Sequence, residues 1–90
     1  MRSIVAVPNP STGQVLILYG VAKAADVTLK IFDASGAVVR RLAEGPQAAG
    51  VHATRWDGRS DAGEQLPAGA YFTRIETPAG VVTGKIVMAH

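Results

Sequence analysis

The stretch that decides the fold is Trp56-Asp57-Gly58-Arg59-Ser60-Asp61-Ala62-Gly63, followed shortly by Leu66-Pro67-Ala68-Gly69-Ala70-Tyr71. Trp56 ends one aromatic strand and Tyr71 opens the next. The residues between them favour turns, because Asp bonds to nearby backbone amides, Gly accepts a positive φ and Pro fixes its own. This pattern is typical of a loop at the edge of a β-sandwich. The carboxylates of the loop also suit a metal or catalytic site, so the function depends on whether the loop is scaffold or site.

Apolar residues alternate with a period of two on both sides of this loop, which predicts short β-strands. Turn signals separate the strands by about 8–12 residues, the spacing of an all-β sandwich. We therefore expect an immunoglobulin-like antiparallel β-sandwich of about seven strands, with Trp56, Tyr71 and Tyr19 pointing into the core. A break is expected at Glu44-Gly45-Pro46. The predicted strands are 4–7, 15–21, 27–31, 38–42, 51–56, 71–76 and 81–88.

The composition is that of one small folded domain, because 48% of the 90 residues are hydrophobic and 18% are charged. The basic residues are scattered, so we expect no concentrated basic surface of the kind that binds nucleic acid. Cysteine is absent, and no apolar run approaches the roughly 20 residues that cross a bilayer. Met1-Arg2-Ser3 leads directly into an apolar strand rather than a signal peptide. We therefore expect residues 1–90 to be a single domain without membrane insertion and, if the natural protein is exported, one excised from a larger protein.

Asp57, Asp61 and Glu64 are the candidate metal ligands, because Ca²⁺ binds several carboxylate and carbonyl oxygens at once. The spacing lacks the alternating acids of a calcium loop, and Arg59 adds a positive charge among them. The alternative is that the two aspartates cap backbone amides of the turn and that Arg59 pairs with one of them. We favour this structural interpretation and expect no metal or other cofactor, with Ca²⁺ as the open alternative.

No combination of side chains predicts an enzyme. Catalysis needs a nucleophile, a base and an orienting acid within hydrogen-bond reach. His52 lies in the middle of a predicted strand, where a structural role is more common. The serines lie in or beside turns or near a terminus, without the strand–turn–helix context of a nucleophile elbow. We predict a domain without catalytic activity.

The strand at residues 15–21 is apolar on both faces, because Leu16 and Leu18 lie between the other apolar residues. A strand of this kind is covered on both sides or lies against a partner. The last strand carries a second apolar row that includes Ile86. We predict a partner surface formed by Leu16, Leu18, Lys85 and Ile86. Its partner would be an upstream domain of the parent protein, a component of the secretion machinery or a second copy of the chain.

Five motifs occur in one order along the sequence. They are Asn9-Pro10-Ser11-Thr12-Gly13, Leu29-Lys30-Ile31-Phe32-Asp33-Ala34-Ser35-Gly36, Gly50-Val51-His52 leading to Trp56-Asp57-Gly58-Arg59, Leu66-Pro67-Ala68-Gly69-Ala70-Tyr71-Phe72, and Lys85-Ile86-Val87-Met88. In this order they resemble the FlgD-type Ig-like module found at the extreme C-terminus of many bacterial secreted proteins. That module is similar to the C-terminal sorting domain of the type IX secretion system. Pro8-Asn9-Pro10 and Lys85 favour the sorting domain, whereas the Trp56 motif favours the form shared with the flagellar hook-capping protein.

Two positions depart from the family pattern. The chain ends in Ala89-His90, where the family commonly ends in Lys or Arg, and this leaves the sorting role open. Thr54 stands where a larger apolar residue is more common, which points to a looser core or to a polar partner beside it.

The resemblance implies a non-catalytic module that acts through protein–protein recognition. Our main hypothesis is a C-terminal module that sorts or anchors a secreted protein at the bacterial cell surface. One alternative is an Ig-like adhesion or carbohydrate-binding module, for which Phe32 and Phe72 are the candidate outward rings. The other alternative is a flagellar hook-assembly domain.

Overall fold

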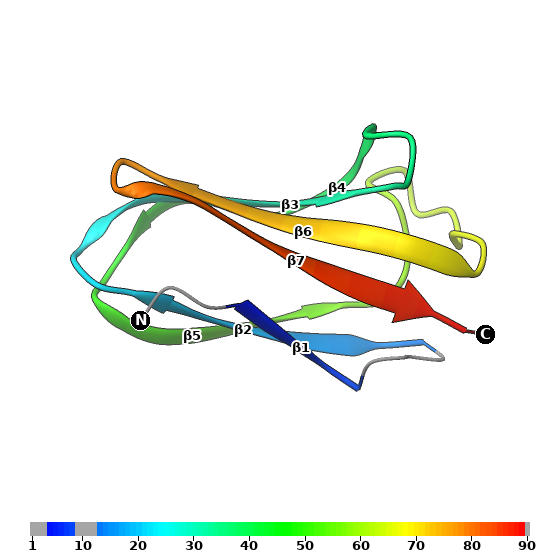
Figure 1. Cartoon of the computed structure of the whole chain (residues 1–90), viewed down its shortest axis with the longest axis horizontal. Helices are drawn as coiled ribbons and strands as arrows, with labels where there is room; N and C mark the ends of the chain where they lie inside the picture. The colour runs from blue at the N-terminus through cyan, green and yellow to red at the C-terminus, as the bar shows by residue number, and fades with distance from the viewer. Residues whose placement is uncertain (1–3, 9–12, 90) are drawn as a thin grey trace.

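The computed structural model describes residues 4–8 and 13–89, which form β-strands and no helix (Figure 1). Within these residues, nothing helical is available to cross a lipid bilayer. The strands are β1 (Ile4–Val7), β2 (Val15–Val21), β3 (Ala25–Phe32), β4 (Val38–Gln47), β5 (Gly50–Trp56), β6 (Gly69–Thr77) and β7 (Gly80–Met88).

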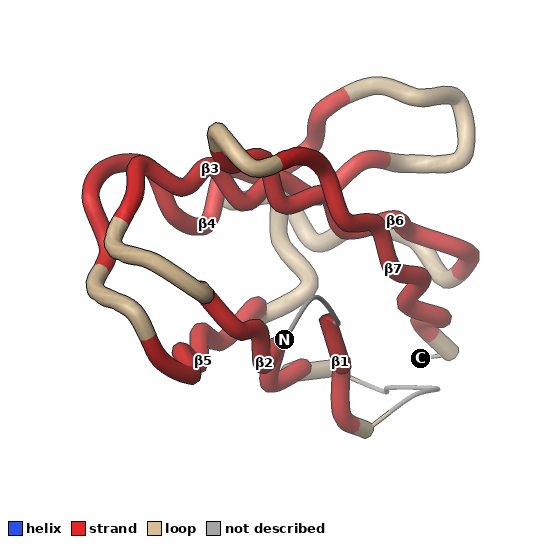
Figure 2. Tube along the Cα trace, turned by 60° about the vertical axis from the view of Figure 1, so that its left-hand side comes forward, coloured by secondary structure: helices blue, strands red, loops and turns tan. Residues whose placement is uncertain are grey.

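The strands form two antiparallel sheets that lie one above the other (Figures 1 and 2). One sheet has the order β1-β2-β5 and the other has the order β4-β3-β6-β7. The chain crosses between the sheets after β2, after β4 and again after β5. Each sheet therefore buries one face against the other, as in other sandwiches. This arrangement confirms the predicted immunoglobulin-like sandwich of seven strands.

The core between the sheets follows from the alternation of apolar residues. On β2 every odd-numbered residue is buried and every even-numbered one is half-buried. Burying a large apolar side chain contributes about 1.5–3 kcal/mol, so this alternation holds the two sheets together. The buried apolar residues are Val15, Ile17, Tyr19, Val21, Val27, Leu29, Ile31, Trp56, Tyr71, Ile75, Ile86 and Met88.

β4 is longer than the sequence predicts. The break expected at Glu44-Gly45-Pro46 is wrong, because β4 stays paired with β3 as far as Gln47. β4 is the edge strand of its sheet. Half of the backbone N–H groups of an edge strand point away from the sheet, so a proline is tolerated there. Glycine and proline therefore do not end β4 at this point, because its pairing with β3 continues past them.

β1 closes one open side of the sandwich by packing against β7. The contact is made at Gly84, where an added Cβ would lie 2.9 Å from Cγ2 of Ile4 and 2.8 Å from Oγ1 of Thr73. Thr73 lies opposite Gly84 in the ladder and is buried, and its hydroxyl has no hydrogen-bond partner among the described residues. The missing side chain at Gly84 makes room for both neighbours.

Candidate functional site

The loop between β5 and β6 is held by its own carboxylates. Oδ1 of Asp57 accepts hydrogen bonds from the backbone N–H of Arg59 at 3.1 Å and from Nη1 of Arg40 at 3.3 Å. Gly58, between Asp57 and Arg59 in the sequence, has a φ of 78°, which glycine adopts without steric cost. Asp57 therefore caps the turn, as the structural interpretation of the sequence predicts.

Asp61 joins this loop to the edge of β4. Its backbone N–H donates to the carbonyl of Val39 at 2.9 Å, and its Oδ1 accepts the backbone N–H of Arg41 at 3.1 Å. Its carboxylate also lies 3.5 Å from Nη1 of Arg41 and 3.8 Å from Nε of Arg40. The loop thus satisfies backbone groups on an edge strand that another chain could otherwise use for pairing.

The three candidate metal ligands do not form a metal centre in the described part of the chain. No group of three or more His, Cys, Asp or Glu side chains there could hold a metal ion. Asp57 and Asp61 are each paired with arginine. Glu64 enters the loop through its backbone, whose carbonyl accepts the N–H of Ser60 at 2.9 Å. Calcium binding stays an untested alternative.

Arg59 does not pair with an aspartate, so that part of the sequence prediction is wrong. Its Nη1 donates instead to the carbonyl of Gly63 at 3.0 Å, inside the same loop. Arg40 takes the predicted role, because β4 runs beside the loop and brings its guanidinium within 3.3 Å of Asp57. Spacing along the sequence could not show that a distant strand supplies this partner.

Trp56 and Tyr71 anchor the two ends of the loop region in the core. Their rings meet edge to face, with centroids 5.5 Å apart and an angle of 68°. Nε1 of Trp56 donates to the carbonyl of Arg59 at 2.9 Å, and the hydroxyl of Tyr71 donates to the carbonyl of Pro67 at 2.6 Å. Burial raises the pKa of Tyr71, and the charge of Asp33 adds to the shift. The inward orientation predicted for both rings is confirmed.

His52 has the structural surroundings that its position in a strand predicts. Its ring stacks on Tyr19, with centroids 5.6 Å apart, and its Nε2 lies 2.7 Å from the carbonyl of Ala48. The hydroxyl of Tyr19 donates to Oε1 of Gln47 at 2.8 Å. These contacts tie the corner between β4 and β5 to β2.

The outer face of the four-stranded sheet mixes paired charges with exposed apolar side chains, among them Phe72 and Val81. Nζ of Lys30 lies 3.8 Å from Oε1 of Glu76, and Nε of Arg74 lies 3.6 Å from the same oxygen. Phe32 and Phe72 lie directly opposite each other on β3 and β6, and Phe72 is 39% exposed. Both rings therefore belong to the outer face, as the sequence predicts. A face with this mixture of side chains is suited to contact with water.

The outer face of the three-stranded sheet is apolar. Leu16 and Leu18 each lie between a residue of β1 and a residue of β5 in the ladder. Both are half-buried and neither is enclosed. Their neighbours are more open, since Val51 is 67% exposed and Val5 is 48% exposed. We call this surface the outer β2 face, and it consists of Val5, Val7, Leu16, Leu18, Gly20, Val51, Ala53 and Arg55.

The other half of the predicted partner surface does not lie on this face. Ile86 is fully buried, so its assignment to a partner surface is wrong. Ile86 pairs with Tyr71, whose side chain faces the core, and alternation then places Lys85 outward beside Phe72. Lys85 is thus exposed, but on the opposite side of the sandwich from Leu16 and Leu18. β7 carries apolar residues on both faces, because Val81 and Val87 lie outward beside Thr83 and Lys85, and only its register shows which face is inside.

Sequence reasoning named only Leu16 and Leu18 of the outer β2 face and missed its other six members, among them the exposed valines Val5, Val7 and Val51. Val5 and Val7 alternate with Ile4 and Ala6, so β1 is apolar on both sides and its period alone does not say which side faces out. Val51 lies in a strand that begins with glycine and alternates weakly. Only the ladder with β2 aligns all three with the two leucines.

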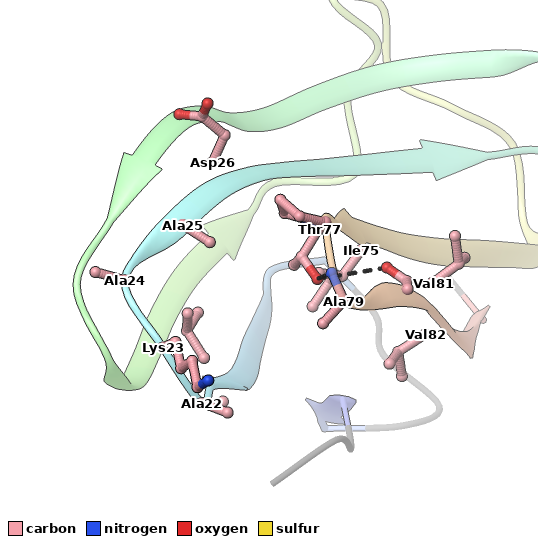
Figure 3. Close-up of a pocket in the computed structure, with 14 residues that line it drawn as sticks. Ala22, Lys23, Ala24, Ala25, Asp26, Ile75, Thr77, Ala79, Val81 and Val82 are labelled. Carbon is pink, nitrogen blue, oxygen red and sulfur yellow. Dashed lines mark hydrogen bonds between the residues drawn. The ribbon is translucent and has the colours of Figure 1, made fainter.

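A cleft of about 740 Å³ opens at one end of the sandwich (Figure 3). It lies where β2 turns into β3 and where β6 turns into β7. The buried residues Val21 and Ile75 contribute to its lining, and Lys23 and Asp26 are its charged members. The segments that form it are far apart in the sequence, so no motif could predict it.

Two stacked antiparallel sheets, joined by an aromatic-anchored loop, define an immunoglobulin-like sandwich domain. The chain belongs to the FlgD Ig-like domain family, whose sequence model matches residues 9–80. It is 44% identical over 59 residues to the basal-body rod modification protein FlgD of Escherichia coli K12, covering 64% of this chain. The chain matches only 26% of the length of that relative.

Solved structures have the same fold. FlgD from Xanthomonas campestris has a TM-score of 0.65 and 29% identity, over 93% of this chain and 60% of its own. Dimeric latent PorU from Porphyromonas gingivalis has a TM-score of 0.75 and 19% identity, over 96% of this chain and 9% of its own. PorZ, a surface component of the type IX secretion system of the same bacterium, has a TM-score of 0.64 and 20% identity, over 98% of this chain and 12% of its own. The matching domain is thus a small part of PorU and of PorZ.

Proposed function

We propose that the domain is a protein-recognition module that sorts or anchors a larger bacterial protein at the cell surface. Membership of the FlgD Ig-like domain family carries this proposal. FlgD from X. campestris is described in connection with hook capping in flagellar assembly, and PorZ as an essential surface component of a secretion system. Both proteins take part in larger bacterial assemblies, and we infer that a small sandwich domain contributes there by binding a neighbouring protein.

The loop supports a role without chemistry. Asp57 and Asp61 are bound to backbone N–H groups and to arginines, and the contacts of His52 fix a strand corner. Residues committed to the scaffold in this way are poorly placed to act as an acid, a base or a ligand. These contacts support a binding module that carries out no reaction.

A hook-assembly role is the second candidate, and sequence identity favours it. The chain is 44% identical to E. coli FlgD in the matched segment, but only 19% identical to PorU. PorZ, the surface component of a type IX secretion system, shares the fold at a TM-score of 0.64, close to the 0.65 of X. campestris FlgD, so the fold is compatible with either role. The carbohydrate-binding alternative has one observation in its favour, the adjacent outward rings of Phe32 and Phe72.

A reporter fusion tests the proposal. Residues 1–90 are fused to the C-terminus of a reporter that carries its own signal peptide, in a strain with a type IX apparatus and in an isogenic strain without it. We expect the reporter on the cell surface only in the first strain. A reporter retained inside the outer membrane in both strains would overturn the sorting role. Restored swimming of a FlgD-deficient E. coli strain, when the chain replaces the matching segment of FlgD, would instead support hook assembly.

A further inference from the structure

We propose that the outer β2 face is the docking surface of this module, and that its partner is a different protein surface with an apolar centre and a carboxylate that meets Arg55. The inference rests on the proposed function, because it describes the partner that a recognition module would bind. It concerns a single surface, whose contribution can be tested separately from sorting.

The two sheets differ in how many charged residues their strands carry. Arg55 is the only Asp, Glu, Lys or Arg residue in β1, β2 and β5. All four strands of the other sheet carry charged residues, and Lys30, Arg74 and Glu76 form ion pairs on its outer face. An antiparallel sheet with one face in water normally has polar residues on that face. The uncharged rows on the outer β2 face are therefore a surface for contact with protein rather than with water.

The size of the face limits what it can do alone. Three strands about 4.8 Å apart, each contributing residues over about 17 Å, give a footprint of roughly 250 Å². A stable complex of separate proteins buries about 800 Å² on each partner. The face is thus too small to hold a free partner firmly. It is adequate when a larger assembly holds the partner protein close, since tethering gives effective concentrations in the millimolar range.

Arg55 argues against a second copy of the chain as the partner. Its side chain has no ion pair or hydrogen bond with any residue in 4–8 or 13–89. A face-to-face pair of identical copies would cover two guanidinium groups and bring no carboxylate, because the face has none. Covering an unpaired charge is costly. A partner with one aspartate or glutamate at this position satisfies Arg55 and fixes the register of docking.

Sedimentation of the isolated chain tests the exclusion of self-association. We expect a monomer at concentrations up to about 100 µM, because the face is too small for a free dimer. A dimer that dissociates on Val51→Asp would overturn the proposal. Val51 is the most exposed valine of the face, so this variant should fold, and circular dichroism of the variant verifies it. Leu18→Asp serves as a second variant at the centre of the face.

Site-specific crosslinking in the sorted reporter fusion identifies the partner surface. The photoreactive residue p-benzoylphenylalanine replaces Leu18, or replaces Thr83, an exposed residue on the outer face of the four-stranded sheet, as the matched control. We expect Leu18 to crosslink to a protein other than the fusion, next to an aspartate or glutamate. Arg55→Glu should lower the yield about tenfold, and Arg55→Lys should retain most of it. Replacement of the partner's aspartate or glutamate by lysine should restore the crosslinking yield of the Arg55→Glu variant.

The outcomes separate this inference from the proposed function. If the fusion is sorted and Leu18 crosslinks no better than Thr83, the docking surface is wrong and the sorting role stands. Crosslinking of Leu18 to a second copy of the chain also overturns the inference. If the fusion is not sorted, the sorting role fails, and sedimentation still decides whether the face is a self-association surface.

Discussion

Replacement of Trp56 by alanine is the most direct test of the view that the loop after β5 belongs to the scaffold. Trp56 is fully buried and packs edge to face on Tyr71, with ring centroids 5.5 Å apart. Its Nε1 also donates to the carbonyl of Arg59 at 2.9 Å, which holds the turn against the core. Trp56→Ala removes the buried ring, its contact with Tyr71 and the hydrogen bond to the carbonyl of Arg59 in one step.

The expected cost follows from these contacts. Large-to-small substitution of a buried aromatic residue costs about 3–5 kcal/mol, which includes the cavity left behind. A domain of this size has a free energy of unfolding of about 5–13 kcal/mol. The variant should therefore lose roughly a quarter of its stability or more, and its Tm should fall by roughly 15–30 °C.

Thermal unfolding followed by circular dichroism, together with urea denaturation, measures this loss. Phe72→Ala is the matched control, because it removes an aromatic ring that is 39% exposed on an outer face, and its Tm should change by only a few degrees. Trp56→Phe keeps a ring beside Tyr71, and its Tm should lie between those of Trp56→Ala and Phe72→Ala. If Trp56→Ala unfolds within a few degrees of the unchanged chain, Trp56 does not anchor the core and the scaffold interpretation of the loop is refuted.

Three further substitutions test other parts of the structure by urea denaturation. Asp61→Ala should cost about 0.5–1.5 kcal/mol by removing the acceptor for the N–H of Arg41, whereas Asp61→Asn, which keeps an oxygen there, should cost less. Gly84→Ala should cost about 1–3 kcal/mol, because its Cβ would lie 2.9 Å from Ile4. Gly13→Ala, with nothing within 4 Å, is the control, and equal losses would contradict the packing. Tyr71→Phe removes the bond to Pro67 and should cost about 0.5–1.5 kcal/mol. The pKa of Tyr71 in the folded state is raised above its ordinary value of 10.0. The protonated hydroxyl therefore contributes its full share of the folding stability below pH 10.0, and this share is lost as the pH rises through the folded-state pKa. The unfolding midpoint of the unchanged chain should therefore fall more steeply in this range than that of Tyr71→Phe.

The sequence predicts those features that depend on local alternation. Trp56, Tyr71 and Tyr19 point inward as expected, because the side-chain period of a strand is fixed by its backbone. The cap at Asp57 is also local, since the carboxylate bonds to an N–H two residues later. Features of this kind need no knowledge of which strands are neighbours.

The features that the sequence predicts wrongly depend on pairing between distant strands. Ile86 belongs to a strand with apolar residues on both faces, and only its pairing with Tyr71 places it in the core. Arg40 replaces Arg59 as the partner of Asp57 because β4 passes beside the loop, 17 residues earlier in the chain. The strand through Pro46 continues because β3 pairs with it on one side. In each case the deciding fact is a neighbour in space that no local pattern specifies.

The contacts of Asp61 bear on where recognition can occur. Asp61 bonds to the backbone of both Val39 and Arg41, so the loop occupies this stretch of the edge of β4. An edge that is already bonded is a poor template for strand addition by another protein. The outer face of the four-stranded sheet carries charges that pair with one another, which leaves little to gain by covering them. Neither the bonded strand edge nor the mutually paired charges apply to the outer β2 face, because its rows are apolar and Arg55 is its one charge. The acidic loop therefore affects function indirectly, by closing an edge and leaving the opposite sheet as the surface on which docking is most favourable.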